Sequence, residues 1–260
     1  MTSLNSIWKR REKTSHKGQN GKVLVIGGSK EYTGSLVLVG LAAYRAGADI
    51  VTIAAPEKVA WAINCGYPDL ITRKFKGDYF DKKHLKEILE LSKNFDVVVI
   101  GNGLGRKSDI FVKEFLNKVN KKCVVDADAI KAGPVLKNAV LTPHTKEFEI
   151  YSGKKLSGEL KTDIEIVKAS AKENIILLKG NIDIIATKDK YYLNKFGNPG
   201  MTKAGTGDVL AGICAGLIAQ KIDDFDAACL AAYLNGRAGD RARKEFGYGF
   251  LASDLLNKIY

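Results

Sequence analysis

The chain has 260 residues, 45% of them hydrophobic and 27% charged, which is typical of a globular protein and excludes a fibrous or disordered one. Its longest apolar run, residues 209–219, is too short to cross a bilayer, and residues 1–18 lack the apolar stretch of a signal peptide. The formal net charge of +12 comes from scattered lysines, whereas a nucleic-acid-binding surface would gather them into a patch. We therefore expect one cytoplasmic domain over residues 1–260 that binds neither nucleic acid nor membrane and attracts phosphate-rich small molecules.

The four cysteines, Cys65, Cys123, Cys214 and Cys229, form no Cys-x-x-Cys pair and lie mostly within apolar runs. This pattern favours core cysteines over a disulfide framework or a metal site. It predicts a reducing compartment, in agreement with a cytoplasmic protein.

The first part of the chain is typical of a strand–helix–strand unit. Residues 1–20 are too polar for a core element and are expected to pack over the edge of the domain. Residues 22–27 form a continuous apolar run that ends in glycine, as in a buried parallel strand. A helix over 36–46 and a second strand over 50–54 follow, so the sheet should be parallel here.

The same alternation continues to the C-terminus. Strands are predicted over 96–100, 122–126, 140–142 and 175–180, with helices over 109–119 and 162–173. Residues 182–187 and 191–194 predict a β-hairpin, and three further helices are predicted from Asp208, over 226–244 and near Ser253. The pattern indicates an α/β fold with a mostly parallel sheet and no second domain.

Polar or glycine-rich residues follow almost every predicted parallel strand. In open α/β sheets, ligands bind beyond the carboxyl ends of the strands, so these residues are site candidates. Each has a structural alternative when taken alone, since an aspartate can cap a turn and a histidine can lie on the surface. The candidates are Gly27-Gly28-Ser29, Gly101-Asn102-Gly103, Asp126, His144 with Glu147, and Lys179-Gly180.

The most informative stretch, residues 197–208, is a loop rich in Gly and Thr that runs directly into an apolar helix. Free N–H groups in the first turn of a helix, together with the helix dipole, bind anions. Gly205 and Gly207 would let the backbone approach a phosphate closely. Asp208 would repel that phosphate unless it accepts a proton from a nucleophile, so the stretch indicates phosphoryl transfer with Asp208 as base.

A structural alternative is that Asp208 only caps the helix and that the glycines only form a turn. The known phosphate-binding patterns do not decide between these interpretations. The Walker motif is absent from the sequence, and Gly205-x-Gly207 lacks the third glycine of the strict dinucleotide-binding motif.

Taken together, these segments resemble the ribokinase-like superfamily and, within it, the ADP- or ATP-dependent NAD(P)H-hydrate dehydratases. The Gly-Thr-Gly-Asp tetrad at 205–208 marks the superfamily alone. The narrower resemblance depends on three blocks, which are His16-Lys17-Gly18, Thr142-Pro143-His144 and Gly197-Asn198-Pro199-Gly200. The remaining similar segments are 25–29, 33–34, 42–47, 100–104, 125–130, 178–180 and 252–254.

The resemblance implies a three-layer α/β/α sandwich and a defined reaction. The substrate would be the S form of NADH or NADPH that carries a hydroxyl on C6 of the nicotinamide ring. ADP or ATP would phosphorylate this hydroxyl, phosphate would leave, and the ring double bond would return. The enzyme would thus be a carbon–oxygen lyase of metabolite repair that uses Mg²⁺ with its nucleotide.

The resemblance also implies roles for individual residues. Asp208 would take the hydroxyl proton while residues 204–207 hold the transferring phosphoryl group. Asp126 and Glu147 would help to place Mg²⁺ through water. The nucleotide would be bound by Lys179, Gly180, Asn181, Ile182, Asp183, Gly205, Thr206 and Gly207. The hydrated dinucleotide would be lined by Ser35, Gly103, Asp126, His144 and Asp208.

The sequence departs from the family pattern at two places. Thr145-Lys146 stand where the family has Pro-Gly, which changes the stiffness of that loop, and Asp183 stands where it has Thr. Many relatives also carry an N-terminal epimerase domain, so we expect a separate epimerase here. Relatives of this kind assemble into tetramers, and a homo-oligomer is therefore expected.

Two other functions remain open at this point. The first is a small-molecule kinase of the same superfamily that acts on a vitamin-precursor alcohol and releases a stable phosphate ester. The second is a non-catalytic nucleotide- or nucleic-acid-binding protein, whose binding to a duplex would weaken steeply with salt.

Overall fold

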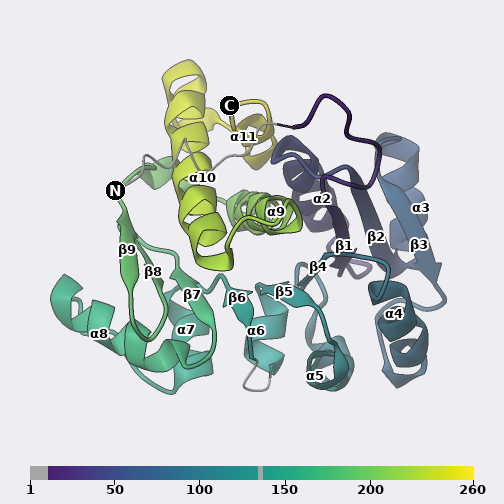
Figure 1. The fold of residues 1–260 in the computed structure, drawn as a ribbon, viewed down its shortest axis with the longest axis horizontal. Helices are drawn as coiled ribbons and strands as arrows, with labels where there is room; N and C mark the ends of the chain where they lie inside the picture. Colours follow the sequence, from purple (N-terminus) through teal and green to yellow (C-terminus); the bar gives the residue numbers. More distant parts are fainter. Residues whose placement is uncertain (1–10, 134–136) are drawn as a thin grey trace.

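The computed structural model describes residues 11–133 and 137–260 and contains a nine-stranded sheet at its centre (Figure 1). The strand order is β3-β2-β1-β4-β5-β6-β7-β8-β9, in which β1 to β7 are parallel and β8 pairs antiparallel with both β7 and β9. This confirms the predicted α/β class and the mostly parallel sheet. The strands are β1 (Lys22–Ile26), β2 (Ile50–Pro56), β3 (Ile71–Phe75), β4 (Val97–Ile100), β5 (Lys122–Val125), β6 (Ala139–Leu141), β7 (Ile175–Leu178), β8 (Asp183–Ala186) and β9 (Tyr191–Asn194).

Helices cover both faces of the sheet, so the protein has three layers (Figure 1). Alternate strand residues serve the two faces, because successive side chains of a strand point in opposite directions: Val23 and Val25 face one layer, Leu24 and Ile26 the other. The first layer contains α2 (Gly34–Arg45), α3 (Glu57–Gly66), α9 (Thr206–Ala219), α10 (Asp224–Phe246) and α11 (Ala252–Leu256). The second contains α4 (Leu85–Ser92), α5 (Asp109–Lys118), α6 (Asp128–Ala132), α7 (Thr145–Ser152) and α8 (Leu160–Ala171).

Helix α9 is apolar all round and lies between the sheet and its neighbouring helices, which is why it is buried along its length. Its glycines allow close packing on α2, since a Cβ at Gly212 would overlap the carbonyl oxygen of Val39, and one at Gly216 would lie 2.6 Å from that of Ala43. The packing fixes the position of the first turn of α9, which carries Thr206, Gly207 and Asp208.

The chain reverses its direction across the sheet between β1 and β4. From β1 it adds β2 and β3 on one side, and then returns to add β4 to β9 on the other. In open α/β sheets, such a switch point is where the loops diverge and a ligand binds. Gly27-Gly28-Ser29 and Gly101-Asn102-Gly103 follow the two strands of this switch point.

The structure confirms the predicted strands and the β8–β9 hairpin, with shifts of one or two residues at their ends. Sequence analysis assigned nothing between 55 and 95, where the structure has α3, β3 and α4. It also began the glycine-loop helix at Asp208, whereas α9 begins at Thr206. The two extra residues place Asp208 inside the first turn rather than at its boundary.

The part of the segment before β1 that the structure describes lies against the loop between α2 and β2. Arg11 Nη1 is 2.9 Å from Asp49 Oδ1, and Asp49 Oδ2 accepts hydrogen bonds from the backbone N–H groups of Gly18 (3.0 Å) and Asn20 (2.9 Å). Residues 1–10 of the segment predicted to pack over the edge of the domain lie outside the described residues.

The prediction of core cysteines is correct for Cys123, Cys214 and Cys229, which are buried. Burial raises the pKa of Cys123 to about 12, so this thiol stays protonated at neutral pH. The prediction is wrong for Cys65, which is exposed because α3 turns Val59, Ala60 and Ile63 toward the core instead. Within 11–133 and 137–260, no helix has both the length and the apolar character needed to cross a membrane.

Candidate active site

Asn102, which follows β4, joins two carboxyl groups from other parts of the chain. Its side-chain Nδ2 donates hydrogen bonds to Asp126 Oδ2 (2.9 Å) and to Asp208 Oδ1 (2.6 Å). Its backbone carbonyl accepts a hydrogen bond from the N–H of Gly28 (2.9 Å), which follows β1. Asn102 thus connects the two strand ends of the switch point to the end of β5 and to the first turn of α9.

Asp126, which follows β5, also binds a lysine from the end of β7. The ammonium group of Lys179 lies 3.0 Å from Asp126 Oδ1, and the hydroxyl of Thr142 donates to the same oxygen (2.8 Å). Burial alone would lower the pKa of Lys179, but the charges of Asp126, Glu147 and Asp208 and the hydrogen bond to Asp126 together raise it above its usual value. Lys179 is therefore a fixed positive charge at neutral pH.

Asp208 is the third residue of α9, and its carboxylate makes no capping hydrogen bond to the helix N–H groups. The N-terminal cap is Gly205, whose φ of +96° favours glycine, and no side chain caps this end. The Asp208 carboxyl group instead accepts hydrogen bonds from Asn102 and Ser35. The structure therefore does not support the alternative in which Asp208 only caps the helix.

The surroundings of Asp208 bring the pKa of its carboxyl group close to neutral pH. Burial, reinforced by the negative charge of Asp126, raises the pKa of Asp208 to about 6, although hydrogen bonds from Asn102 and Ser35 and the charge of Lys179 act in the opposite direction. A carboxyl group with such a pKa is largely ionised at pH 7 and still basic enough to take a proton from a hydroxyl. Its protonation state suits general-base catalysis.

The first turn of α9 and Lys179 together form a positive site beside Asp208. A Cβ at Gly207 would lie 3.2 Å from Lys179 Nζ, so the ammonium group is directly over this turn. The positive end of the α9 dipole points the same way. The hydroxyl of Thr206 is used inside the loop, where it donates to the carbonyls of Met201 (2.7 Å) and Lys203 (3.0 Å). Backbone N–H groups and Lys179 are thus available to an anion here.

Lys203, the cation of the glycine loop, is directed away from this site. Its ammonium group donates to the backbone carbonyls of Phe250 (2.6 Å) and Tyr248, and it lies 4.8 Å from the centroid of the Phe250 ring. Lys203 therefore attaches the loop to the segment between α10 and α11.

Asp183 closes the turn that follows β7. Its carboxylate accepts hydrogen bonds from the N–H of Gly180 (3.0 Å) and from Asn194 Nδ2 (2.9 Å), and burial raises its pKa. Gly180 and Asn181 are exposed, and Ile182 is half-buried. Asp183 therefore stabilises the turn that contains the predicted nucleotide-binding residues, because its carboxylate is hydrogen-bonded to that turn and to β9.

His144 and Glu147 form a reciprocal cap at the start of α7. The N–H of His144 donates to Glu147 Oε2 (3.1 Å), and that of Glu147 donates to His144 Nδ1 (3.4 Å). The imidazole is half exposed, whereas the Glu147 side chain is 4% exposed. Thr145-Lys146 begin the helix normally despite the departure from the family's Pro-Gly.

Two other predicted substrate contacts lie on either side of the switch point. Ser35, near the start of α2, hydrogen-bonds the Asp208 carboxyl group. Gly103 has a φ of +68°, and a Cβ there would lie 2.7 Å from Tyr32 Cβ, so only glycine fits against the loop after β1. The structure thus gathers Ser35, Gly103, Asp126, Lys179, Gly207 and Asp208 at the carboxyl edge of the sheet.

Comparison with known proteins decides the family. Residues 23–260 match the model of the NAD(P)H-hydrate dehydratase family. The chain belongs to this family. It is 44% identical over 258 residues to a bifunctional NAD(P)H-hydrate repair enzyme, Nnr, of Methanocaldococcus jannaschii, an alignment that covers 96% of this chain and 50% of the relative.

Solved structures agree with this assignment. An ADP/ATP-dependent NAD(P)H-hydrate dehydratase from Bacillus subtilis, co-crystallised with ATP/Mg²⁺, is 28% identical with a TM-score of 0.82 over 98% of this chain and 94% of that one. A ribokinase-like protein from Enterococcus faecalis, 24% identical with a TM-score of 0.86, covers 98% of this chain and 91% of its own. The ribokinase-like fold and the family resemblance are thereby confirmed. The chain spans about half the length of the curated relatives that it matches.

This dehydratase-family chain does not present a direct metal site at the predicted carboxylates. Both oxygens of Asp126 accept hydrogen bonds, and Glu147 Oε2 is held by the backbone of His144 while its Oε1 faces Lys131 at 3.7 Å. In the part of the chain that the structure describes, no three His, Cys, Asp or Glu side chains converge on a metal position. The water-mediated role of Asp126 and Glu147 stays a prediction.

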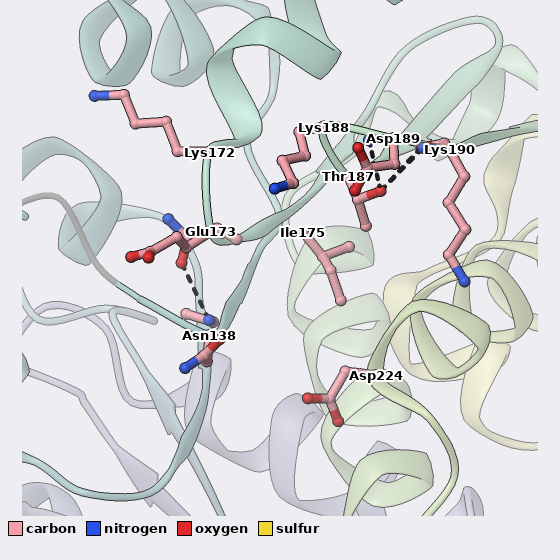
Figure 2. Close-up of a pocket in the computed structure, with 11 residues that line it drawn as sticks. Asn138, Lys172, Glu173, Ile175, Thr187, Lys188, Asp189, Lys190 and Asp224 are labelled. Atoms are coloured by element: carbon pink, nitrogen blue, oxygen red, sulfur yellow. Dashed lines mark hydrogen bonds between the residues drawn. The ribbon is translucent and has the colours of Figure 1, made fainter.

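A cavity of about 450 Å³ lies away from this site, at the amino ends of β6 and β7 (Figure 2). The β8–β9 turn carries Lys188 and Lys190 into its wall, but none of the site residues predicted from the sequence lines it. Of its three acidic residues, which are Glu173, Asp189 and Asp224, Asp224 is paired with Lys122 (2.5 Å) and Glu173 with Lys137 (3.3 Å). The cavity is therefore separate from the Asp208 site.

Sequence analysis named Asn102 as a site candidate within Gly101-Asn102-Gly103 but gave it no role of its own. It missed Thr142, which it used only as part of a family block. Both are fully buried polar residues directly after a strand, and their contacts to Asp126 give them their place in the site. An amide between two glycines after an apolar run was the one available signal for Asn102.

Proposed function

We propose that this chain catalyses the ADP- or ATP-dependent dehydration of the S form of hydrated NADH or NADPH. The observation that carries the proposal is the position of Asp208, held in the first turn of α9 beside Lys179 and Gly207. A base next to an anion-binding helix end is the arrangement that phosphorylation of a hydroxyl requires. The family assignment supports the nicotinamide substrate.

In the proposed first step, Asp208 takes the proton of the C6 hydroxyl, and the hydroxyl oxygen attacks the terminal phosphorus of the nucleotide. The new O–P bond replaces the bond to the leaving ADP or AMP. The first-turn N–H groups of α9 and the ammonium group of Lys179 face the charge on the transferring phosphoryl group. The segment of Lys179, Gly180, Asn181, Ile182 and Asp183 would bind the nucleotide beyond its phosphates.

In the second step the C6–O bond breaks and phosphate leaves with the bonding electrons. Loss of a proton from the adjacent ring carbon restores the double bond and gives NADH or NADPH. Phosphate is a far better leaving group than hydroxide, which explains why a kinase fold serves a dehydration. Mg²⁺ would enter with the nucleotide phosphates, whose charge it neutralises.

The substrate side would be formed by Ser35, Gly103 and His144. Ser35 hydrogen-bonds the base itself, so a bound hydroxyl would meet Ser35 and Asp208 together. The half-exposed imidazole of His144 would contact the dinucleotide from the end of β6. Asp126 would act through Lys179 and Asn102, since its own oxygens are already used.

We further propose that the described domain acts within a homo-oligomer and alongside an epimerase that supplies the S hydrate. The curated relatives are named bifunctional, which supports a second activity in the same repair process. Light scattering of the purified protein would give the oligomeric state directly. The cytoplasm remains the expected location.

The deciding experiment follows absorbance at the reduced-nicotinamide band with hydrated NADH, Mg²⁺ and either ADP or ATP. An increase in absorbance with ADP or with ATP establishes the reaction and identifies the phosphoryl donor. The Asp208→Asn variant should show no such increase. If neither donor gives an increase with folded protein, the dehydratase proposal fails. Formation of a stable phosphate ester from a vitamin-precursor alcohol would then indicate a small-molecule kinase, and salt-sensitive duplex binding a nucleic-acid-binding protein.

A further inference from the structure

Asn102 is the residue whose contacts the proposed mechanism does not yet explain. It has no exposed surface, and its two N–H bonds are both directed at carboxyl groups, Asp126 at 2.9 Å and Asp208 at 2.6 Å. The amide orientation follows from its neighbours, because a flipped side chain would place the amide oxygen against two carboxylates.

The side-chain oxygen of Asn102 accepts no hydrogen bond from the residues that the structure describes. Among the described residues, Asn102 Oδ1 has no hydrogen-bond partner although it is buried. A buried acceptor without a partner destabilises a fold, so a residue with a purely structural role would gain from an apolar side chain of the same size. The retained amide therefore indicates that its donors serve the site.

The backbone of Asn102 is held equally firmly. The N–H of Gly28 donates to its carbonyl at 2.9 Å, and a Cβ at Gly27 would overlap that same oxygen. The amide thus projects from a fixed point of the switch region toward α9. Its hydrogen bond to Asp208 therefore connects the end of β4 directly to the first turn of α9.

We propose that Asn102 is a positioning residue, whose single amide nitrogen orients the Asp208 carboxylate as a proton acceptor and holds it apart from Asp126. This deepens the proposed function, on which it rests for its catalytic meaning. The charged groups that act on Asp208 are Asp126, which disfavours its ionised form, and Lys179, which favours it. The Asn102 hydrogen bond acts in the same direction as Lys179, so its removal should make Asp208 harder to ionise.

The Asn102→Leu variant removes both donors at nearly constant volume. Thr142→Val is the matched control, because Thr142 is equally buried and also donates to Asp126, at 2.8 Å, without contacting Asp208. Titration of ¹³C-labelled aspartate carboxyls by NMR, with the Asp208 signal assigned through Asp208→Asn, needs no substrate. It therefore reads the positioning role even if the dehydratase assay fails.

We expect the midpoint for Asp208 to rise by about one pH unit in Asn102→Leu, which is the size of shift that the loss of one hydrogen bond to the ionised form gives, and to stay within about 0.3 units in Thr142→Val. In the active enzyme, a midpoint raised by about one unit would leave roughly half of Asp208 ionised at pH 7, so kcat should fall by about twofold there and recover at higher pH, with KM values little changed. A midpoint that moves equally in the two variants, or in neither, overturns the proposal. A uniform loss of kcat at every pH overturns it as well, since that is what a structural role alone would produce.

Discussion

The ammonium group of Lys179 lies 3.0 Å from Oδ1 of Asp126, although the two residues are 53 positions apart in the chain. One follows β7 and the other follows β5, and β6 lies between these strands in the sheet. The pair places a positive charge over Gly207 and neutralises a carboxylate that is 2% exposed. The pair therefore joins two strand ends that β6 separates and holds opposite charges together at the site.

Removing Lys179 should destabilise the protein as well as inactivate it. Lys179→Met leaves Asp126 as a buried charge without its cation, which costs about 3–5 kcal/mol in comparable pairs. Urea unfolding at pH 7.5 measures this loss. The double variant Lys179→Met/Asp126→Asn removes both charges and should regain most of the stability while staying inactive. Equal stability of the single variant and the parent protein would contradict the pairing.

Replacing Asp208 by Asn should lower activity and raise stability at neutral pH. The base is lost, so the dehydration rate should fall by about 10²–10⁴-fold. Folding raises the pKa of Asp208 from 3.8 to about 6, which means that the folded state holds this proton more tightly. The contribution to stability is thus complete below pH 3.8 and is lost as pH rises through about 6.

The variant lacks this penalty, so its advantage over the parent should appear between pH 4 and 7 and reach about 1–3 kcal/mol. Urea midpoints at pH 4 and pH 7.5 test the sign. If Asp208→Asn exceeded the parent protein in stability by more at pH 4 than at pH 7.5, folding would not raise the pKa of Asp208, and the prediction would be wrong.

Lys203→Met should change stability more than nucleotide binding. The ammonium group serves the carbonyls of Tyr248 and Phe250, and hydrogen bonds from a charged donor contribute about 1.5–3 kcal/mol. The KM for the nucleotide should change less than about threefold, because the charge is directed away from the α9 turn. Lys195→Met removes an exposed lysine and is the control for net charge. A large rise in nucleotide KM for Lys203→Met alone would assign Lys203 to the phosphate site.

Gly207→Ala should weaken the site while leaving the fold intact. The new Cβ would lie 3.2 Å from Lys179 Nζ, so the ammonium group must move away from the turn that it covers. We expect a rise in nucleotide KM of about tenfold, equivalent to roughly 1.4 kcal/mol of binding. Gly66→Ala, at a position with no heavy atom within 4 Å, should keep full activity and gain about 0.4–1 kcal/mol of stability. Unchanged kinetics in Gly207→Ala would place the phosphates elsewhere.

Local sequence patterns predicted most of the elements but not those of the segment 57–95, nor the short helices α6 and α7. The buried strands β1, β4 and β5 are continuous apolar runs, because helices cover both of their faces. Strand β3 is an edge strand of sequence Ile-Thr-Arg-Lys-Phe whose side chains are largely exposed, so it lacks such a run. Because this strand was not recognised, the strand–helix alternation that would have predicted α3 and α4 on either side of it was not recognised either.

The sequence by itself determined the α/β class, the family, and the pairing of a glycine-rich loop with Asp208, because each depends on residues that are adjacent or regularly spaced in the chain. Only the tertiary structure decided which polar groups meet. Asn102 and Asp208 are 106 positions apart, and their contact exists because β4 lies at the switch point while α9 packs on α2 above it. The same packing directed Lys179 into the site and Lys203 away from it, since a side chain's partners depend on which strand ends become neighbours.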